Sequence, residues 1–203
     1  MKVSILDYGA GNLASVYNAF YNLDISVKII SSNEDIKKSD RLIIPGVGSA
    51  KNSINYLKNK KLFLSIHEFI RKERPILGIC LGLQIFCKSL YEDGKSNGLG
   101  FLDADVKKIY EENNILSTHM GWNSVSSNEE INKILKIKEN SFFYFCHSYS
   151  LHIKNSEKFN ISETFFKRKI PAIILKENFI GTQFHPEKSQ VSGSKLLENF
   201  LKI

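Results

Sequence analysis

The first half of the chain alternates short apolar segments with segments whose apolar residues recur at helical spacing, and this alternation restricts the possible folds more than any other feature. Uninterrupted apolar strands separated by helices are typical of a parallel sheet that helices cover on both faces. Strands are predicted at residues 2–6, 26–30, 41–45 and 75–79, and helices at 12–22, at 49–72 in two pieces, and at 81–91.

The second half has a different pattern, with several short β segments followed by a final helix at 193–202. The predicted fold is α/β, with a doubly wound, mostly parallel central sheet, helices on both faces and a β-rich extension. A chain of 203 residues without repeats, low-complexity tracts or a linker is expected to form one domain over residues 1–203. The β segments are ADVKKIY (104–110), NILSTHM (114–120), SFFYFCHSY (141–149), PAIILKE (171–177) and NFIGTQF (178–184).

Charge and apolar content argue against several classes of partner. The net charge is +7, but only four of the 28 basic residues are arginine and the lysines are scattered, unlike the clustered basic surfaces that bind nucleic acid. No apolar stretch approaches the roughly 20 residues of a membrane span, and the first residues lack the apolar core of a signal peptide. We therefore expect a cytoplasmic protein with reduced cysteines, no nucleic-acid partner and no membrane contact.

Residues 76–84, ILGICLGLQ, place a cysteine between two glycines where a predicted strand meets a predicted helix. This arrangement has the mechanics of a nucleophile elbow, in which small neighbours leave room for a tight turn that presents an attacking side chain. The positive end of the following helix favours a thiolate, and the Leu81 N–H can donate to an oxyanion. Cys80 is therefore the candidate nucleophile, with the amide of Gln84 one turn further on.

The alternative for any cysteine is a buried structural thiol, because cysteine is among the most buried residue types. Cys87, expected inside a helix, and Cys146, inside an aromatic strand, fit that alternative. Cys80 alone has both flanking glycines and the strand–helix boundary.

A nucleophilic cysteine needs a base, and the base needs a group that orients it. His185 follows a predicted strand within GTQFHPEKS (181–189), and Glu187 comes two residues later. Together with Cys80 they complete a set of nucleophile, base and orienting acid. The remaining histidines are expected on a solvated helix (His67) or in β segments as core or edge residues (His119, His147 and His152).

A second oxyanion donor is expected directly after the predicted strand 41–45. The glycines of Gly46-Val47-Gly48 allow a peptide N–H to turn toward the pocket. A simple turn between a strand and a helix would use the same residues, so both interpretations stand.

These motifs resemble the class I, or triad, glutamine amidotransferases, and among them the glutaminase subunits of imidazole glycerol phosphate synthases. GICLGLQ with HPE is typical of the broad class, whereas HMGWN, HSY and QFHPEKS are typical of the subfamily. The matching segments occur in family order over essentially the whole chain: DYGAGNLASV (7–16), PGVGS (45–49), PILGICLGLQ (75–84), NGLGF (97–101), HMGWNSV (119–125), FCHSYS (145–150) and GTQFHPEKSQVSGSKLLENF (181–200).

The resemblance implies a glutaminase reaction. Cys80 would attack the side-chain amide of glutamine, His185 would shuttle the proton, and Glu187 would orient the imidazole. Ammonia would leave, and water would hydrolyse the glutamyl thioester to glutamate. By the same resemblance, the oxyanion hole would use Val47 and Leu81, and the glutamine would be held by Gly46, Gly48, Gln84, Ser148 and Tyr149.

The resemblance also implies a protein partner and no metal or organic cofactor. In the family, ammonia passes to a separate cyclase subunit of the (β/α)8-barrel type. The cyclase combines it with a ribulosyl-aminoimidazole-carboxamide nucleotide to give imidazole glycerol phosphate and an aminoimidazole carboxamide ribotide. In this heterodimer the docking face would include Asn12, Trp122, Tyr144 and Lys188.

Two positions depart from the family pattern. Thr118 replaces the common proline before HMGWN, and Cys146 replaces a small aliphatic residue before HSY. Both leave the triad intact. Relatives with the same motifs supply ammonia for amidino-sugar synthesis on surface glycans. This acceptor is the alternative, because the acceptor binds the partner rather than the glutaminase.

A rival from another class is a NAD-binding Rossmann domain. ILDYGAGNLA has the spacing Gly9-x-Gly11-x-x-Ala14 after a predicted strand, and Glu34 or Asp35 follows near the position of a ribose-binding acid. That acid should stand at the tip of the second strand, and the rival leaves the triad unexplained. A stand-alone cysteine hydrolase or stress protein on the same fold, and an inactive assembly subunit, are further alternatives. Gln84, HSY and PGVG argue against the first, and the complete triad argues against the second.

Overall fold

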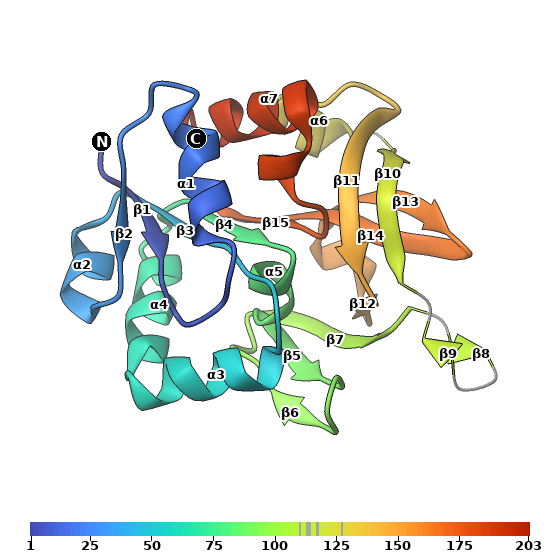
Figure 1. The fold of residues 1–203 in the computed structure, drawn as a ribbon, viewed down its shortest axis with the longest axis horizontal. Coiled ribbons are helices and arrows are strands. Elements are labelled where there is room, and N and C mark those ends of the chain that lie inside the picture. The colour runs from blue at the N-terminus through green and yellow to red at the C-terminus, as the bar shows by residue number, and fades with distance from the viewer. Residues whose placement is uncertain (110, 113–114, 117, 127) are drawn as a thin grey trace.

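The computed structural model describes residues 1–109, 111–112, 115–116, 118–126 and 128–203, and it is built on a seven-stranded sheet in the order β13-β14-β15-β4-β3-β1-β2 (Figure 1). The strands from β15 to β2 run parallel, whereas β14 and β13 are added antiparallel at one edge. The predicted mostly parallel sheet is thereby confirmed. Its strands are β1 (Val3–Leu6), β2 (Val27–Ile30), β3 (Arg41–Ile44), β4 (Ile76–Ile79), β13 (Asn160–Phe166), β14 (Arg168–Lys176) and β15 (Phe179–Thr182).

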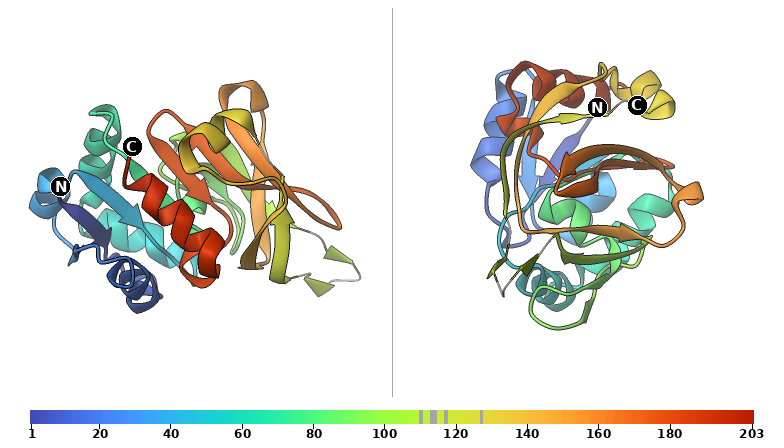
Figure 2. Two further views of the ribbon diagram at one scale, coloured as in Figure 1. Left: turned by 90° about the horizontal axis from the view of Figure 1, so that it is seen from above. Right: turned by 90° about the vertical axis from the view of Figure 1, so that its right-hand side faces the viewer.

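Successive side chains of the parallel strands point to opposite faces of the sheet and pack into two separate hydrophobic cores, one on each face. Ile5 and Ile43 belong to the core shared with α1 and α7, while Leu6 and Leu42 belong to the core shared with α2, α3 and α4. Figure 2 shows the helices on both sides of the sheet, as the doubly wound prediction requires. The helices are α1 (Leu13–Tyr21), α2 (Asn33–Lys38), α3 (Ala50–Asn59), α4 (Leu62–Arg71), α5 (Leu81–Gln84), α6 (Glu129–Leu135) and α7 (Gln190–Phe200), with 3-10 turns η1 (Ser156–Lys158) and η2 (Pro186–Lys188).

The second half adds the predicted β-rich extension. A four-stranded sheet in the order β12-β7-β5-β6 joins the core shared with α2, α3 and α4, whereas the antiparallel pair β10–β11 joins the core shared with α1 and α7. A short pair β8–β9 projects from the body (Figure 1). Residues 110, 114 and 117, on which parts of two predicted β segments fall, lie outside the described residues. These strands are β5 (Cys87–Leu90), β6 (Ser96–Asn97), β7 (Leu102–Lys108), β8 (Glu111–Glu112), β9 (Ile115–Leu116), β10 (His119–Val125), β11 (Ser141–His147) and β12 (Tyr149–Ile153).

The helix predicted over residues 81–91 is wrong beyond its first turn. α5 ends at Gln84, and the chain turns into β5, which pairs with β6 and β7. Residues 81–87 are all buried, so the apolar run has no solvent face from which its period could be read. Cys87 therefore starts a strand and does not lie within a helix. Burial, with the charge of Asp105 added, raises the pKa of its thiol, as suits the expected structural cysteine.

Two short helices that the sequence pattern did not predict, α2 and α6, each begin with a capping side chain. Ser32 Oγ accepts the Asp35 N–H at 3.1 Å, and Asn128 Oδ1 accepts the Ile131 N–H at 3.2 Å. Among the described residues, the structure has no helix of the length and apolar character needed to cross a bilayer.

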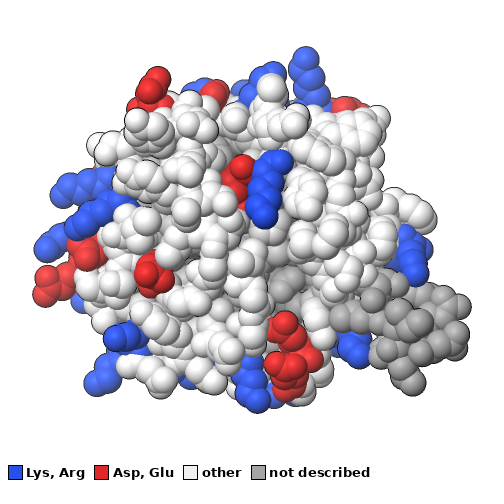
Figure 3. Space-filling view, viewed as in Figure 1, with Lys and Arg blue, Asp and Glu red and all other residues white. Residues whose placement is uncertain are grey.

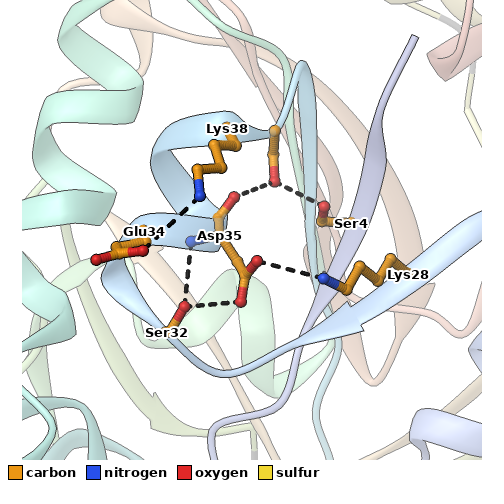
Figure 4. A network of polar contacts seen from close by, with 7 residues as sticks. Ser4, Lys28, Ser32, Glu34, Asp35 and Lys38 are labelled. Carbon is orange, nitrogen blue, oxygen red and sulfur yellow. Dashed lines mark hydrogen bonds and ion pairs between the residues drawn. The ribbon is translucent and has the colours of Figure 1, made fainter.

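Asp35 and Glu34, the acids that the dinucleotide alternative would use to bind ribose, form hydrogen bonds and ion pairs that stabilise α2. The Asp35 carboxylate accepts the Ser32 hydroxyl at 2.7 Å and the Lys28 ammonium at 3.3 Å, and Glu34 faces Lys38 across the same helix (Figure 4). These contacts lie beside the edge strand β2. Asp35 thus completes the start of the helix and holds it to β2, which gives no support to a ribose-binding role.

Candidate active site

Cys80 occupies a strained turn between β4 and α5. Its backbone has φ +52° and ψ −105°, a region that residues with a Cβ rarely adopt. The Cys80 N–H donates to the Thr182 carbonyl of β15 at 2.7 Å, and the Gln84 N–H donates to the Cys80 carbonyl at 3.1 Å to begin α5. The turn expected of a nucleophile elbow is present, and it sets the thiol at the carboxyl end of the parallel strands.

The two glycines that flank Cys80 are needed for close backbone packing. A Cβ on Gly82 would overlap the Ile44 carbonyl of β3, and a Cβ on Gly78 would lie 2.9 Å from the Gly82 oxygen. Both contacts involve backbone, which cannot give way as a flexible side chain can. Glycine at these positions therefore allows α5 to start directly against β3 and β4.

His185 and Glu187 lie on the turn that joins β15 to α7. The His185 N–H donates to the Tyr144 carbonyl of β11 at 2.9 Å, and the Ser189 hydroxyl donates to the His185 carbonyl at 2.6 Å. The imidazole Nδ1 lies 2.7 Å from Glu187 Oε1, and 1% and 0% of the two side chains are exposed. Since a carboxylate only accepts, Nδ1 carries the proton, and Nε2 remains for Cys80.

The charge environment of His185 favours a protonated imidazole. Burial by itself lowers the pKa of His185, but hydrogen bonds to Cys80 and Glu187 and the negative charges of both groups raise it to about 10. An imidazolium that contacts a sulfur atom is the partner that stabilises a thiolate nucleophile. The predicted nucleophile, base and orienting acid are thus brought together by two segments of the chain, the β4–α5 turn and the turn between β15 and α7.

A cavity of about 530 Å³ opens in front of Cys80. It takes in four of the five residues predicted to hold glutamine, and also Val47 and Leu81 of the predicted oxyanion hole. Gly46 does not line it but packs behind, between Tyr8 and Leu81. The cavity is lined by Val47, Gly48, Cys80, Leu81, Gln84, Glu92, Asp93, Thr118, Cys146, His147, Ser148 and Tyr149.

The Leu81 N–H, predicted as an oxyanion donor, has a partner in this structure. It donates to the Gly46 carbonyl at 3.3 Å. Next to it, Gly48 has a backbone φ of +106°, which a residue with a side chain would adopt only under strain. In this conformation the Gly46 carbonyl therefore occupies the N–H that the sequence predicts as an oxyanion donor.

The residues predicted at a partner interface cluster beside the His185–Glu187 turn. The Asn12 amide donates to Glu187 Oε1, so this residue also supports the triad acid. Trp122 of β10 stands edge-on to Tyr144 of β11, with ring centroids 6.1 Å apart, and Lys188 is exposed on the turn itself.

Besides Thr118 and His147 of the cavity wall, sequence reasoning missed three polar residues at the site. The Gln183 Nε2 lies 3.7 Å from Cys80 Sγ, and its position two residues before His185 in a strand-end motif was the available signal. Glu92 and Asp93 line the cavity because β5 turns them back toward it. The helix predicted over residues 81–91 gave no reason to expect that the chain after it returns to the cavity.

A family model described as Glutamine amidotransferase class-I matches residues 4–203. The chain is a class I glutamine amidotransferase. The family resemblance and the glutaminase activity predicted from the motifs are thereby confirmed. This amidotransferase is 39% identical over 202 residues to "Imidazole glycerol phosphate synthase subunit HisH 1" of Campylobacter jejuni (strain RM1221), covering 99% of the chain and 100% of the relative. It is 37% identical over 209 residues to "Imidazole glycerol phosphate synthase subunit HisH" of Pelagibacter ubique (strain HTCC1062), covering all of both.

Solved structures share the fold of this amidotransferase. "Structure of PurLQS from Thermotoga maritima" superposes with a TM-score of 0.76 at 16% identity, over 99% of this chain and 97% of the other. "Crystal structure of glutamine amidotransferase" gives a TM-score of 0.75 at 16% identity, over 100% and 98%. At such identities the likeness concerns the fold alone, which agrees with the α/β prediction.

Proposed function

We propose that this amidotransferase is the glutaminase subunit of an imidazole glycerol phosphate synthase and supplies ammonia to a (β/α)8-barrel cyclase in histidine biosynthesis. One observation carries the chemistry: Cys80 stands on a strained turn at the cavity wall, in contact with a buried His185–Glu187 pair. The full-length identity to named subunits of that synthase supports the pathway.

The residues divide the reaction as follows. The Cys80 sulfur attacks the amide carbon of glutamine, and the His185 imidazolium gives its proton to the nitrogen, which leaves as ammonia. Water then adds to the glutamyl thioester while His185 takes up a proton, and glutamate leaves as the thiol re-forms. Glu187 keeps Nε2 of the imidazole directed at these atoms. The carboxylates of Glu92 and Asp93 give the cavity the charge that suits the α-ammonium group of glutamine.

The partner face is proposed on β10 and β11, beside the triad. Trp122 and Phe142 are 46% and 56% exposed, and together with Val191 they line a groove of about 290 Å³. Figure 3 shows that this face carries few charged side chains at its centre and most of them along its outline. Exposed aromatic residues on a weakly charged surface are typical of a protein interface. Ammonia released at Cys80 would reach the cyclase across this face.

We further propose that residues 1–203 act as one catalytic domain in the cytoplasm. Both hydrophobic cores are built on the same central sheet, which supports one unit. Cys80, Cys87 and Cys146 are free thiols, in keeping with a reducing compartment.

The proposal is tested by measuring glutamate release from glutamine by the purified chain. The chain is assayed alone, with the cyclase barrel of the same organism, and with the barrel plus the ribulosyl-aminoimidazole-carboxamide nucleotide. Because the Leu81 N–H is held by Gly46, we expect a low rate alone and strong stimulation by barrel plus nucleotide, lost in Cys80→Ala. Glutamate release that this barrel and nucleotide leave unchanged would contradict the histidine pathway and favour the amidino-sugar alternative.

A further inference from the structure

Gln183 is a fully buried amide that the reaction described above leaves without a role. Its Nε2 lies 3.7 Å from Cys80 Sγ, and its Oε1 lies 3.2 Å from Gln84 Nε2. The Gln183 N–H donates to the Ala172 carbonyl of β14 at 2.8 Å, which fixes the residue at the end of β15. A buried amide in contact with a nucleophile is in a position to act on it.

A backbone carbonyl determines which way this amide faces. Gln84 Nε2 lies 3.0 Å from the Tyr149 carbonyl, and a carbonyl only accepts, so the nitrogen of Gln84 must face it. The same nitrogen then donates to Oε1 of Gln183. The nitrogen of Gln183 is left toward the sulfur, where it donates a hydrogen bond.

The same carbonyl also determines the proton positions of two buried histidines. The His147 Nδ1 lies 2.8 Å from the Tyr149 carbonyl and must donate to it, so His147 Nε2 accepts from His119 Nδ1 at 3.1 Å. His119 Nε2 in turn accepts from Asn123 Nδ2 at 3.2 Å, and that nitrogen also donates to the Phe165 carbonyl at 2.9 Å. Each ring therefore carries one proton and is neutral.

Burial keeps the two rings in this state. It lowers the pKa of His119 to about 4 and that of His147 to about 3. For His147 the hydrogen bond to Tyr149 opposes this shift, and the charges of His119 and His185 add to it. Phe145 and Phe166 stack on His119 at 4.4 and 4.5 Å. A proton added to either ring would set two N–H donors against each other, so one arrangement alone satisfies every partner.

We propose, on the basis of the proposed glutaminase function, that Gln183 is a positioning residue whose amide donates to the Cys80 sulfur and stabilises its thiolate. Its orientation is fixed by a hydrogen-bond relay that runs through Gln84, the Tyr149 carbonyl, His147 and His119 to Asn123. The relay starts at the nucleophile and ends on β10, next to Trp122.

The first test replaces Gln183 by methionine, which has a similar length and no donor. A hydrogen bond to a charged group changes an equilibrium or rate constant by about a factor of ten or more. We therefore expect kcat to fall about tenfold while KM stays within about twofold. We expect KM to change little because Gln84, which is predicted to bind glutamine, keeps its hydrogen bond to the Tyr149 carbonyl. Alkylation of Cys80 by iodoacetamide, followed on its peptide by mass spectrometry, should slow by a similar factor. The titratable groups that act on Cys80, His185 and Tyr8, are unchanged in this variant. A kcat and an alkylation rate equal to those of the wild type would overturn the proposal.

The second test separates the links of the relay with two substitutions of His147. His147→Asn keeps a nitrogen close to the position of Nδ1 and so keeps the bond to Tyr149, whereas His147→Leu removes it. We expect His147→Leu to slow iodoacetamide alkylation of Cys80 several-fold and His147→Asn to restore most of that loss. Equal alkylation rates in the two variants would remove the histidine pair from the proposal.

A matched control variant measures how far a general loss of stability, away from the relay, affects kcat. Thr164 is buried in β13, where its hydroxyl donates to the Ser124 carbonyl at 2.8 Å. Thr164→Val should lower the free energy of unfolding and leave kcat unchanged, and a fall in kcat equal to that of Gln183→Met would contradict a specific role for Gln183. If the wild type released no glutamate, the proposed function would fail, and the alkylation rates would still test the contact between Gln183 and Cys80.

Discussion

One carboxylate oxygen joins the triad to the loop between β1 and α1. Glu187 Oε1 accepts both from His185 Nδ1 and from the amide of Asn12. The acid that orients the imidazole is therefore itself held by a residue more than half a chain away in sequence. Substitutions of Glu187 and Asn12 should separate the effect of the carboxylate charge on His185 from the effect of the hydrogen bond that holds the carboxylate in place.

The first residue-scale prediction concerns Glu187→Gln. The substitution keeps the size of the side chain and removes the charge that helps to raise the pKa of His185, so we expect kcat to fall by about a hundredfold or more. His185 then loses its proton at a lower pH, and the alkaline limb of the pH–rate profile should shift to lower pH. Asn12→Ala, which removes one neutral donor, should reduce kcat only several-fold. Comparable losses in the two variants would show that the charge of Glu187 is unimportant.

The second concerns the elbow. Gly82→Ala would drive a methyl group into the Ile44 carbonyl, so we expect it to lower the free energy of unfolding by more than about 2 kcal/mol. Gly11→Ala is the matched comparison, because its Cβ would meet only a methyl group of Val47, at 3.0 Å. Urea denaturation of both variants measures the difference. A tolerated Gly82→Ala would mean that α5 can move away from β3.

The triad could be predicted from the sequence, because the glycines around Cys80 and the strand end before His185 are local signals. For Gln183 the sequence offered only its place two residues before His185, since its role depends on Gln84 and the Tyr149 carbonyl, both remote in sequence. The same holds for Asn12, whose contact with Glu187 spans most of the chain.

Among the elements, most helices and strands of the first half were predicted well because their apolar residues face defined cores. β5 was not, because a run that is buried all round has no amphipathic period. α2 and α6 were missed for another reason. They are short, and their starts depend on single capping residues, Ser32 and Asn128, rather than on a long apolar stripe.

The third prediction belongs to the β10–β11 pair, in which His119 and His147 are cross-strand partners. Their folded pKa values, about 4 and about 3, lie below the value of about 6.5 in an unfolded chain. Between these values the unfolded state binds more protons, so stability is complete above pH 6.5 and falls as the pH is lowered through that window. His152, whose pKa is also lowered, by burial first, contributes in the same direction. His185, whose pKa is raised, acts in the opposite direction: its contribution is complete below pH 6.5 and is lost progressively as the pH rises from 6.5 to about 10.

Urea midpoints between pH 6.5 and pH 5 test this dependence, since His185 acts above this range and the lowered pKa values of Asp35 and Asp40 act below it. Asp35 is held by its hydrogen bonds to Ser32 and Lys28, and Asp40 by the Lys2 N–H. We expect the midpoint to fall over this range in the wild type and to change less in a His119→Phe, His147→Leu double variant. A slope that the double variant preserves in full would assign the pH dependence to other groups.

Over the whole molecule, the central sheet separates two apolar surfaces with different surroundings. Trp122 and Phe142 on the β10–β11 side adjoin the His185–Glu187 turn, whereas Leu64, 74% exposed on α4, lies on the opposite side of the sheet. Ammonia is produced at the carboxyl end of the strands, next to the first surface. Geometry therefore favours a partner on β10 and β11 over one on α4.

The last prediction compares Phe142→Ser with Leu64→Ser. Loss of an exposed aromatic anchor typically weakens an interface by more than about 1 kcal/mol, so Phe142→Ser should raise the Kd for the cyclase barrel about tenfold, as titration calorimetry would record. At limiting barrel concentration, stimulated glutamate release should fall, and it should recover when the barrel is in excess, because Cys80, His185 and Glu187 are untouched. Leu64→Ser should alter neither quantity. If Leu64→Ser weakened binding instead, the partner would dock on α4, and ammonia would have to cross the packed core between Cys80 and that face.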